Sequence, residues 1–246
     1  MPTTVELFRD DADLNECDAV VTAVDGHAVQ LDRTVFYPQG GGQAGDAGVL
    51  VLADGRTLAV ADTRKGPEPG QIVHLLAELA DASGLKVGDA ITARIDSARR
   101  QAHRRFHTST HLLCALVPHP VDGCSITAGY ARLDFHMTEP LDKDMLNAGL
   151  ARYVAGAHPV TTRWITDAEL DANPQLVRSM SVQPPRGTGR VRLVEVQGVD
   201  LQPCGGTHVN NTADIGPVVV TKIEKKSATT RRVVLGFAVP ANPEGA

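Results

Sequence analysis

The segment His107-Thr108-Ser109-Thr110-His111 decides how the rest of the sequence is arranged. It belongs to a helical pattern that starts at Asp96, a predicted N-cap, runs to Leu116 and stops before Pro118. Residues four positions apart on a helix lie on the same face, one turn above the other. The two imidazoles of the segment can therefore reach one metal ion.

A second segment, Gln202-Pro203-Cys204-Gly205-Gly206-Thr207-His208, carries a thiol and a third imidazole, again four residues apart. Three nitrogens and one sulfur are a ligand set that zinc accepts. We therefore predict a Zn²⁺ site between a helix and a loop, formed by His107, His111, Cys204 and His208. Thr108 stands where a zinc-protease helix carries its catalytic Glu, which disfavours a protease. Four protein ligands are typical of a structural zinc, whereas catalytic zinc keeps a position open, and the sequence leaves both alternatives open.

The other histidines and cysteines have no partner at a spacing typical of metal ligands. We assign the remaining thiols to core positions, at Cys17, Cys114 and Cys124. The remaining imidazoles are expected at packed or surface positions, namely His27, His74, His103, His119, His136 and His158. Four cysteines in 246 residues do not suggest a disulfide framework, which favours a reducing cytoplasm.

The composition is ordinary for a globular protein, with 42% hydrophobic and 22% charged residues. No apolar run approaches the roughly 20 residues that span a bilayer, and the first residues lack the pattern of a signal peptide. We therefore expect no membrane partner and a cytoplasmic location. The net charge of −5 argues against indiscriminate nucleic-acid binding, although basic residues gather locally around 94–105, 186–192 and 222–232.

Residues 5–95 show short β-like segments separated by turn signals. The strand candidates are residues 20–24, 27–31, 49–52, 57–60 and 91–95. Asp25-Gly26 and Asp54-Gly55 favour hairpin turns, because both dipeptides tolerate positive φ angles. A short helix is expected at residues 74–82. Several short strands with regular turns predict a small β-barrel.

A glycine-rich loop, Phe36-Tyr37-Pro38-Gln39-Gly40-Gly41-Gly42-Gln43, interrupts this pattern. Consecutive glycines are costly in conformational entropy, so they usually mark unusual φ angles or a close approach to the backbone. The loop is either a tight turn of the barrel or a surface on which a bulky ligand lies against bare backbone, and the sequence alone does not separate the two.

The second part of the chain mixes helices and strands, so the predicted fold class is α+β. Helices are expected at 96–116, 143–155 and 168–173. Strands are expected at 125–135 (one or two, around Gly129), 160–165, 191–196, 218–223 and 232–239. The tail, residues 240–246, is predicted to be disordered.

These motifs together resemble the editing domains of alanyl-tRNA synthetases. The residues that carry the resemblance are His107 to His111, Cys204 to Val209, the Phe36 to Gln43 loop, Lys222-Ile223-Glu224 and Arg231-Arg232. The whole chain is similar to the free-standing relatives, the AlaX proteins, in their medium-length form with an N-terminal glycine-motif domain. The resemblance implies a β-barrel glycine-motif domain at 1–93 and a zinc-binding α+β editing domain at 94–246.

The same resemblance implies an activity: hydrolysis of the ester that joins a wrong amino acid, chiefly serine and perhaps glycine, to alanine tRNA. It implies a residue that reads the seryl hydroxyl, for which Ser125 and Thr127 both remain candidates. The pocket wall would include Thr110, Gln43, Gly40, Gly41 and Gly42. The phosphates of the acceptor stem would meet Arg104, Arg105, Lys225, Arg231 and Arg232. No general base is assigned, since Glu224 is better explained as a salt-bridge partner of neighbouring cations.

Two other functions remain open at this point. The first is a structural-zinc module that binds tRNA without hydrolysing it, and the second is a zinc hydrolase that acts on another small ester or amide. The basic clusters favour tRNA over a small metabolite. The oligomeric state stays open, with a monomer compatible with the sequence.

Overall fold

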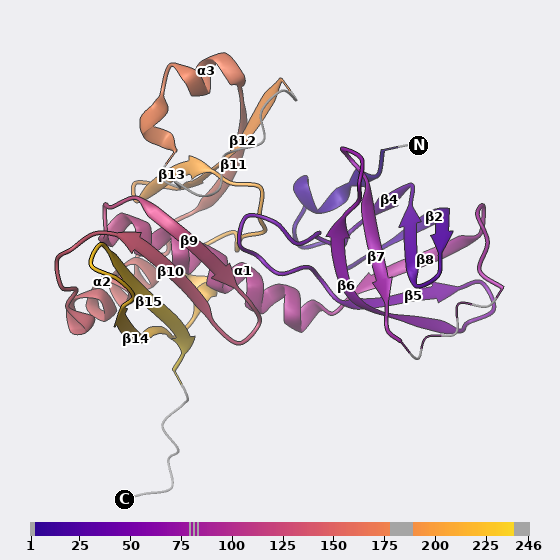
Figure 1. Cartoon of the computed structure of the whole chain (residues 1–246), viewed down its shortest axis with the longest axis horizontal. Coiled ribbons are helices and arrows are strands. Elements are labelled where there is room, and N and C mark those ends of the chain that lie inside the picture. The colour runs from indigo at the N-terminus through magenta and orange to yellow at the C-terminus, as the bar shows by residue number, and fades with distance from the viewer. Residues whose placement is uncertain (1–2, 79, 81, 83, 178–188, 239–246) are drawn as a thin grey trace, which may run out of the picture. The chain divides into compact units, whose positions relative to one another are not determined.

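The computed structural model describes residues 3–78, 80, 82, 84–177 and 189–238 (Figure 1). Its fold is α+β, as predicted. The chain forms two compact units, Met1–Arg104 with Gly205–Thr207 and Arg105–Cys204 with His208–Ala246. Helix α1 (Ser97–Leu116) belongs in part to each of them. The domain limits expected from the sequence, 1–93 and 94–246, stay a prediction.

A closed β-barrel is the main feature of the first unit, and it confirms the predicted barrel. Antiparallel strands form it in the order β2-β3-β7-β6-β5-β8. Their bounds are β2 (Glu16–Asp25), β3 (Ala28–Leu31), β5 (Gly48–Leu52), β6 (Thr57–Lys65), β7 (Ile72–Leu76) and β8 (Ala90–Ile95). Alternate side chains fill the interior, as Leu58 and Val60 of β6 do. Outside the barrel, β1 (Val5–Glu6) pairs in parallel with β4 (Arg33–Thr34).

Two hairpin turns of the barrel form at the predicted Asp-Gly dipeptides. Gly26, between β2 and β3, has φ 58°, and Gly55, between β5 and β6, has φ 85°. The short helix expected at 74–82 is wrong. Ile72–Leu76 is strand β7, which pairs with both β3 and β6, and no helix is found among the described residues of 77–82. The alternating burial of β7 shows that the apolar period is two.

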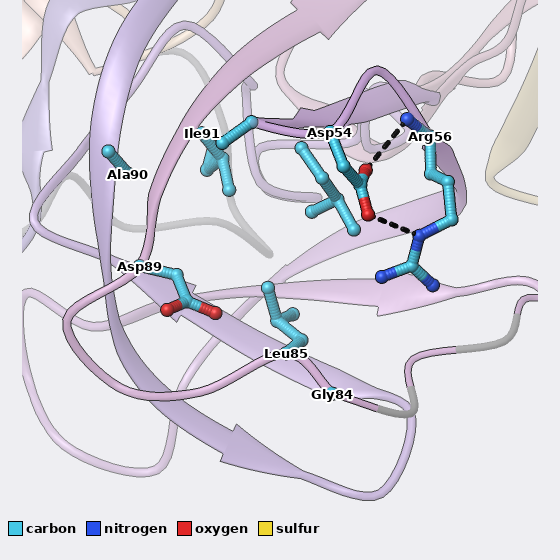
Figure 2. A pocket seen from close by; sticks show the side chains of 9 residues that line it. Asp54, Arg56, Gly84, Leu85, Asp89, Ala90 and Ile91 are labelled. Atoms are coloured by element: carbon cyan, nitrogen blue, oxygen red, sulfur yellow. Dashed lines mark hydrogen bonds and ion pairs between the residues drawn. The ribbon is translucent and has the colours of Figure 1, made fainter.

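A hollow of about 260 Å³ opens beside the turn between β5 and β6 (Figure 2). Its lining consists of Leu52, Ala53, Asp54, Arg56, Gly84, Leu85, Asp89, Ala90 and Ile91. Asp54 accepts hydrogen bonds from the backbone nitrogen of Arg56 at 3.0 Å and from its Nε at 2.7 Å. Asp89 accepts one from the backbone nitrogen of Lys86 at 2.8 Å. These carboxylates therefore stabilise turns, and none of the predicted site residues lines the hollow.

The glycine-rich loop lies between β4 and β5 and contains a tight turn. Gly40 and Gln43 exchange both backbone hydrogen bonds, each at 3.0 Å, which leaves Gly41 and Gly42 at the central positions. Both have positive φ, 58° and 86°, a combination that glycine adopts without strain. The turn interpretation of the loop is therefore confirmed at Gly41 and Gly42, and the ligand-binding interpretation stays a prediction.

A buried ion pair in the first unit joins this loop to the start of α1. The Nε of Arg100 donates to Asp46 Oδ2 at 3.0 Å, and its Nη2 also binds this carboxylate. The backbone nitrogen of Tyr37 donates to the same Asp46 Oδ2 at 2.7 Å. Burial by itself raises the pKa of Asp46, but His103 and Arg100 more than offset this and hold the pKa below its ordinary value. Asp46 is therefore a carboxylate at neutral pH, and it fixes the first turn of α1.

The second unit has a core that two antiparallel sheets share. The larger sheet has the order β14-β15-β10-β9. Its strands are β9 (Val121–Ile126), β10 (Ala131–His136), β14 (Val218–Lys225) and β15 (Thr230–Phe237). Helices α1 and α2 (Lys143–Ala155) contribute Leu112, Leu113, Leu146 and Leu150 to this core. Asp142 caps α2, because its side chain accepts hydrogen bonds from the first backbone nitrogens of the helix.

The smaller sheet has the order β11-β12-β13, with β11 (Val160–Thr166), β12 (Arg190–Val196) and β13 (Asp200–Pro203). One of its faces contributes Val160, Val194 and Val196 to the shared core. The other face carries Ile165 and Val191, which pack with Leu170 of α3 (Asp167–Asp171) in a small separate core. The 3-10 helices are η1 (Leu7–Arg9), η2 (Pro174–Leu176) and η3 (Thr212–Ile215).

Most helices and strands expected in the second part of the chain are present, with ends shifted by a few residues. The stretch 125–135 forms parts of two strands around Gly129, as expected. Strand β13 was not predicted, and the tail at 240–246 lies outside the described residues. Among the described residues, no helix combines the length and the apolar character needed to cross a membrane.

Candidate metal centre

The four predicted ligands gather in the second unit. Helix α1 supplies His107 and His111, Cys204 follows β13, and His208 lies at the end of the loop. One donor atom from each residue lies within 4.8 Å of all the others. The Sγ of Cys204 is 3.3 Å from the Nε2 atoms of both His107 and His208. This convergence of nitrogen and sulfur donors is compatible with a single metal ion.

Hydrogen bonds orient two of the imidazoles. The Nδ1 of His111 lies 2.9 Å from Oδ2 of the buried Asp200, which can only accept when ionised. His111 therefore carries its proton on Nδ1 and leaves Nε2 as the metal-binding atom. The Nδ1 of His208 lies 3.2 Å from Thr108 Oγ1. Carboxylate or hydroxyl partners of this kind fix the tautomer and the direction of a ligating histidine.

These supporting residues were not predicted from the sequence. Asp200 and Gln202 alternate along β13 ahead of Cys204, and Gln202 Nε2 donates to Asp200 Oδ2 at 2.8 Å. The Nη1 of Arg192 donates to the carbonyl oxygen of Cys204 at 3.0 Å. A strand with period two at residues 200, 202 and 204 was the signal that could have placed all three side chains on one face.

The electrostatics of the cluster favour a thiolate beside neutral and charged imidazoles. Burial raises the pKa of the Cys204 thiol, but His107 and His208 more than offset this and hold the pKa well below its ordinary value. Burial lowers the pKa of His111, yet the hydrogen bonds to Asp200 and Cys204 raise it to about 9. Burial, followed by the neighbouring His107, holds the pKa of His208 well below its ordinary value. A thiolate is the form of cysteine that binds zinc. Zinc binding would displace the proton from Nε2 of His111, as metal binding to histidine generally does, so the donor set fits this metal.

The other cysteines lie in core positions, as predicted. Cys114 is buried in the shared core of the second unit, and Cys124 packs against that core. Burial, aided by the charge of Cys204, raises the pKa of Cys124 to about 12, so this thiol stays protonated at neutral pH. Cys17 packs against the barrel core, and burial raises its pKa as well.

Gln43 of the glycine-rich loop binds a residue of the Cys204–His208 loop, and both belong to the first unit. Its Nε2 donates to Thr207 Oγ1 at 3.0 Å, and its Oε1 accepts from the backbone nitrogen of Thr207 at 3.1 Å. Both residues are fully buried. The two bonds fix Thr207, which directly precedes the ligand His208 in the sequence.

Comparison with known proteins identifies the family. Residues 191–234 match the family model of the threonyl and alanyl tRNA synthetase second additional domain, and residues 4–99 match that of the class II (A) tRNA synthetases. The chain is 33% identical to the alanyl-tRNA editing protein AlaX-M of Methanosarcina barkeri, over 94% of this chain and 97% of the relative. The AlaX-M of Saccharolobus solfataricus is 32% identical with the same coverage. The chain belongs to the AlaX family.

The chain is also similar to part of a larger enzyme. The alanine–tRNA ligase of Metallosphaera sedula is 34% identical over 92% of this chain, which spans 25% of the ligase. The resemblance seen in the sequence motifs is therefore confirmed for nearly the whole chain.

The residues that an AlaX protein is expected to use for its substrate lie at several places. Thr110 is buried on α1 and donates to the carbonyl oxygen of His107 at 2.7 Å. Ser125 directly precedes the core residue Ile126 on β9, so its side chain lies on the opposite face of the strand. The Oγ1 of Thr127 lies in the turn after β9, where it accepts from the backbone nitrogen of Tyr130 at 3.1 Å. The roles of Ser125 and Thr127 stay predictions.

The predicted phosphate-binding residues of this AlaX protein also make contacts within the chain. Arg104 is buried and binds Asp13, whereas Arg105 donates to the carbonyl oxygen of Ile215 at 2.6 Å. Lys225 is exposed at the end of β14. Arg231 is buried and donates to the carbonyl oxygen of Thr138, and Arg232 binds both carboxylate oxygens of Asp134. Glu224 pairs with Lys222 at 2.7 Å, in keeping with its assignment as a salt-bridge residue.

Proposed function

We propose that this AlaX protein hydrolyses the ester of mischarged alanine tRNA, with serine as the chief amino acid removed and glycine as a second. The observation that carries the proposal is the buried cluster of three imidazoles and one thiolate in a chain whose relatives are alanyl-tRNA editing proteins. The tRNA is the partner, and the site of action would be the cytoplasm.

A separate hydrolytic site is needed for a physical reason. A synthetase pocket rejects an amino acid that adds a hydroxyl, or loses a methyl, by only about 10- to 200-fold. Serine and glycine differ from alanine in these two ways. A second site that reads the amino acid again can therefore remove the products of both errors.

The residues of the cluster would hold one zinc through His107, His111, Cys204 and His208. When bound, zinc would polarise the ester carbonyl and so supply the electrostatic part of catalysis. Asp200 and Thr108 would keep two of the imidazoles in the required tautomer and direction. Arg192 would hold the backbone of Cys204 in place.

One observation favours a second candidate function. The cluster consists of four protein donors, and a zinc with four protein ligands is usually structural. The chain would then be a zinc-stabilised module that binds alanine tRNA without cleaving its ester. A zinc hydrolase for another small ester or amide remains as a third alternative.

A deacylation assay separates these functions. The full chain is incubated with Ser-tRNA, Gly-tRNA and Ala-tRNA of the alanine isoacceptor, and the remaining ester is followed over time. We expect fast loss of the seryl ester and slow loss of the alanyl ester. Binding of the tRNA with no ester loss would support the module, and cleavage of small esters alone would support the third alternative.

The role of the cluster is tested by removing its thiolate. Cys204→Ala should release most of about one equivalent of zinc per chain and abolish deacylation, because both a charge and a bond are lost. Cys114→Ala is the matched control, since it removes a buried thiol from α1 outside the cluster. Zinc content is measured by atomic emission. Full zinc retention in Cys204→Ala would show that the assignment is wrong.

A further inference from the structure

The single tryptophan of the chain, Trp164, lies on β11 with 41% of its surface exposed. An aromatic ring that is partly exposed in this way offers an apolar face on which another planar group can stack. The guanidinium carbon of Arg190 lies 4.4 Å from the centre of the indole ring. The ring is thus held by a cation on one side.

The position of Trp164 in the smaller sheet relates it to the metal cluster within the second unit. Trp164 is paired with Arg192 on β12, and the carbonyl oxygen of Arg192 accepts a hydrogen bond from the backbone nitrogen of Cys204. The three residues therefore form one row across the sheet. Adjacent strands are about 4.8 Å apart, so Trp164 and the ligand Cys204 are roughly 10 Å apart along this row.

The face of the sheet is also shared. Asp200 and Gln202 both contact Nδ1 of His111, so the face on which they lie is that of the metal cluster. Their partners Val196 and Val194 alternate along β12 with residues of the other face, and Arg192 follows them at the same period of two. Trp164 is paired with Arg192, so its indole lies on this face too.

We propose that Trp164 and Arg190 form a stacking site for an unpaired base at the acceptor end of the tRNA. Single-stranded nucleotides bind proteins by stacking on aromatic rings, with arginines that meet their phosphates or add cation–π contacts. A base on Trp164 would place the sugar and its ester along the row that leads to Cys204. The proposal rests on the proposed function for the identity of the nucleic acid.

Charge and chemistry favour nucleotides as the occupant. The guanidinium of Arg190, which lies over the indole ring, suits a phosphodiester. A protein partner that simply covers an exposed tryptophan is the alternative, and it makes no use of this guanidinium group. Titration with intact and shortened tRNA separates the two occupants.

The fluorescence of the protein reports this site directly, because Trp164 is the sole tryptophan. Uncharged alanine tRNA is titrated into the full chain, and the same tRNA without its unpaired 3′ nucleotides is the control. Base stacking should quench the emission with the intact tRNA and leave it nearly unchanged with the shortened one. Equal emission changes with both tRNAs, or none with either, would overturn the proposal.

Variants give the second measurement. Trp164→Ala should weaken the affinity for intact tRNA by roughly 5- to 150-fold and raise KM for its seryl ester, with the zinc content unchanged. Trp164→Phe should recover part of the loss, because it keeps an aromatic face. Arg190→Ala should also weaken binding, whereas Arg152→Ala, which removes a guanidinium from the Tyr153 ring on α2, should not.

The outcomes distinguish this proposal from the proposed function. Quenching by intact tRNA without deacylation would support the stacking site and contradict the hydrolase. Deacylation with an unchanged KM in a folded, zinc-loaded Trp164→Ala would support the hydrolase and contradict the stacking site. If Trp164→Ala fails to fold, the wild-type titration and Trp164→Phe still decide.

Discussion

Asp46 and Arg100 show at the scale of single residues how an interior charge can be both costly and necessary. Both are buried, and Asp46 also accepts a hydrogen bond from the backbone of Tyr37. Removing one partner of such a pair leaves the other as an uncompensated charge in a place that water does not reach. The pair connects the glycine-rich loop to the turn of α1 that precedes His107.

We predict that Asp46→Asn lowers the free energy of unfolding by about 3–5 kcal/mol. Asp54→Asn is the matched control, since it breaks an exposed pair with Arg56 that should contribute less than about 1 kcal/mol. Urea unfolding followed by circular dichroism measures both. Equal effects of the two substitutions would contradict the role given to the buried pair.

At the same scale, the four donors of the metal cluster could be predicted from the sequence, whereas the residues that orient them could not. The four donors were predicted because each pair is four residues apart, a spacing that a helix or a short loop converts into proximity. Asp200 and Thr108 were missed because their partners lie about 90 to 100 residues away, and only the tertiary fold brings them together. Local spacing predicts ligands more readily than it predicts what orients them.

At the scale of elements, strand β7 carries a histidine, His74, that is fully buried in the first unit. The Nδ1 of His74 lies 3.1 Å from the carbonyl oxygen of Val29, so it must donate, and Nε2 accepts from Thr34 Oγ1 at 2.8 Å. Burial lowers the pKa of His74 to about 4, although the bond to Val29 acts in the opposite direction. The neutral imidazole is therefore the form that fits this strand.

This depressed pKa predicts that the barrel loses stability in mild acid. The folded pKa of about 4 lies below the ordinary value of 6.5, so the unfolded chain binds the proton first. The contribution of His74 to the free energy of unfolding is fully present above pH 6.5 and declines as the pH falls towards 4. Between pH 7 and pH 5 the loss should be about 2 kcal/mol.

The measurement compares the pH dependence of urea unfolding in the full chain with that of His74→Gln. The variant cannot titrate at this position, so its stability should fall less between pH 7 and pH 5. Parallel curves for the two proteins would show that another group controls the acid response.

The same strand illustrates the limit of local patterns. Residues 72–76 were assigned in part to a helix because a short apolar run has no clear period, and pairing with both β3 and β6 decides its conformation. Strand β13 was not predicted because it is only four residues long and contains a proline, which is unusual within a strand. The barrel was predicted because its hairpin turns are encoded locally, at Gly26 and Gly55.

On the scale of the whole molecule, the chain order of the ligands matters. His111 and Cys204 are separated by about 90 residues, which include both helices and strands of the second unit. Bringing them together lowers the entropy of the chain. The chain must lose this entropy before the metal can bind all four ligands and stabilise the folded state. The site is therefore assembled from distant parts of the chain.

Zinc would consequently be captured late in folding and would act on the rate of unfolding. We expect that zinc leaves the refolding rate nearly unchanged and slows unfolding by a factor that grows with its free concentration. Stopped-flow refolding and unfolding in urea, with zinc or with a chelator, measure the two rates. If zinc instead accelerated refolding, the two ligand segments would have to meet before the transition state, and the metal would guide the folding of this chain as well as protect the folded form.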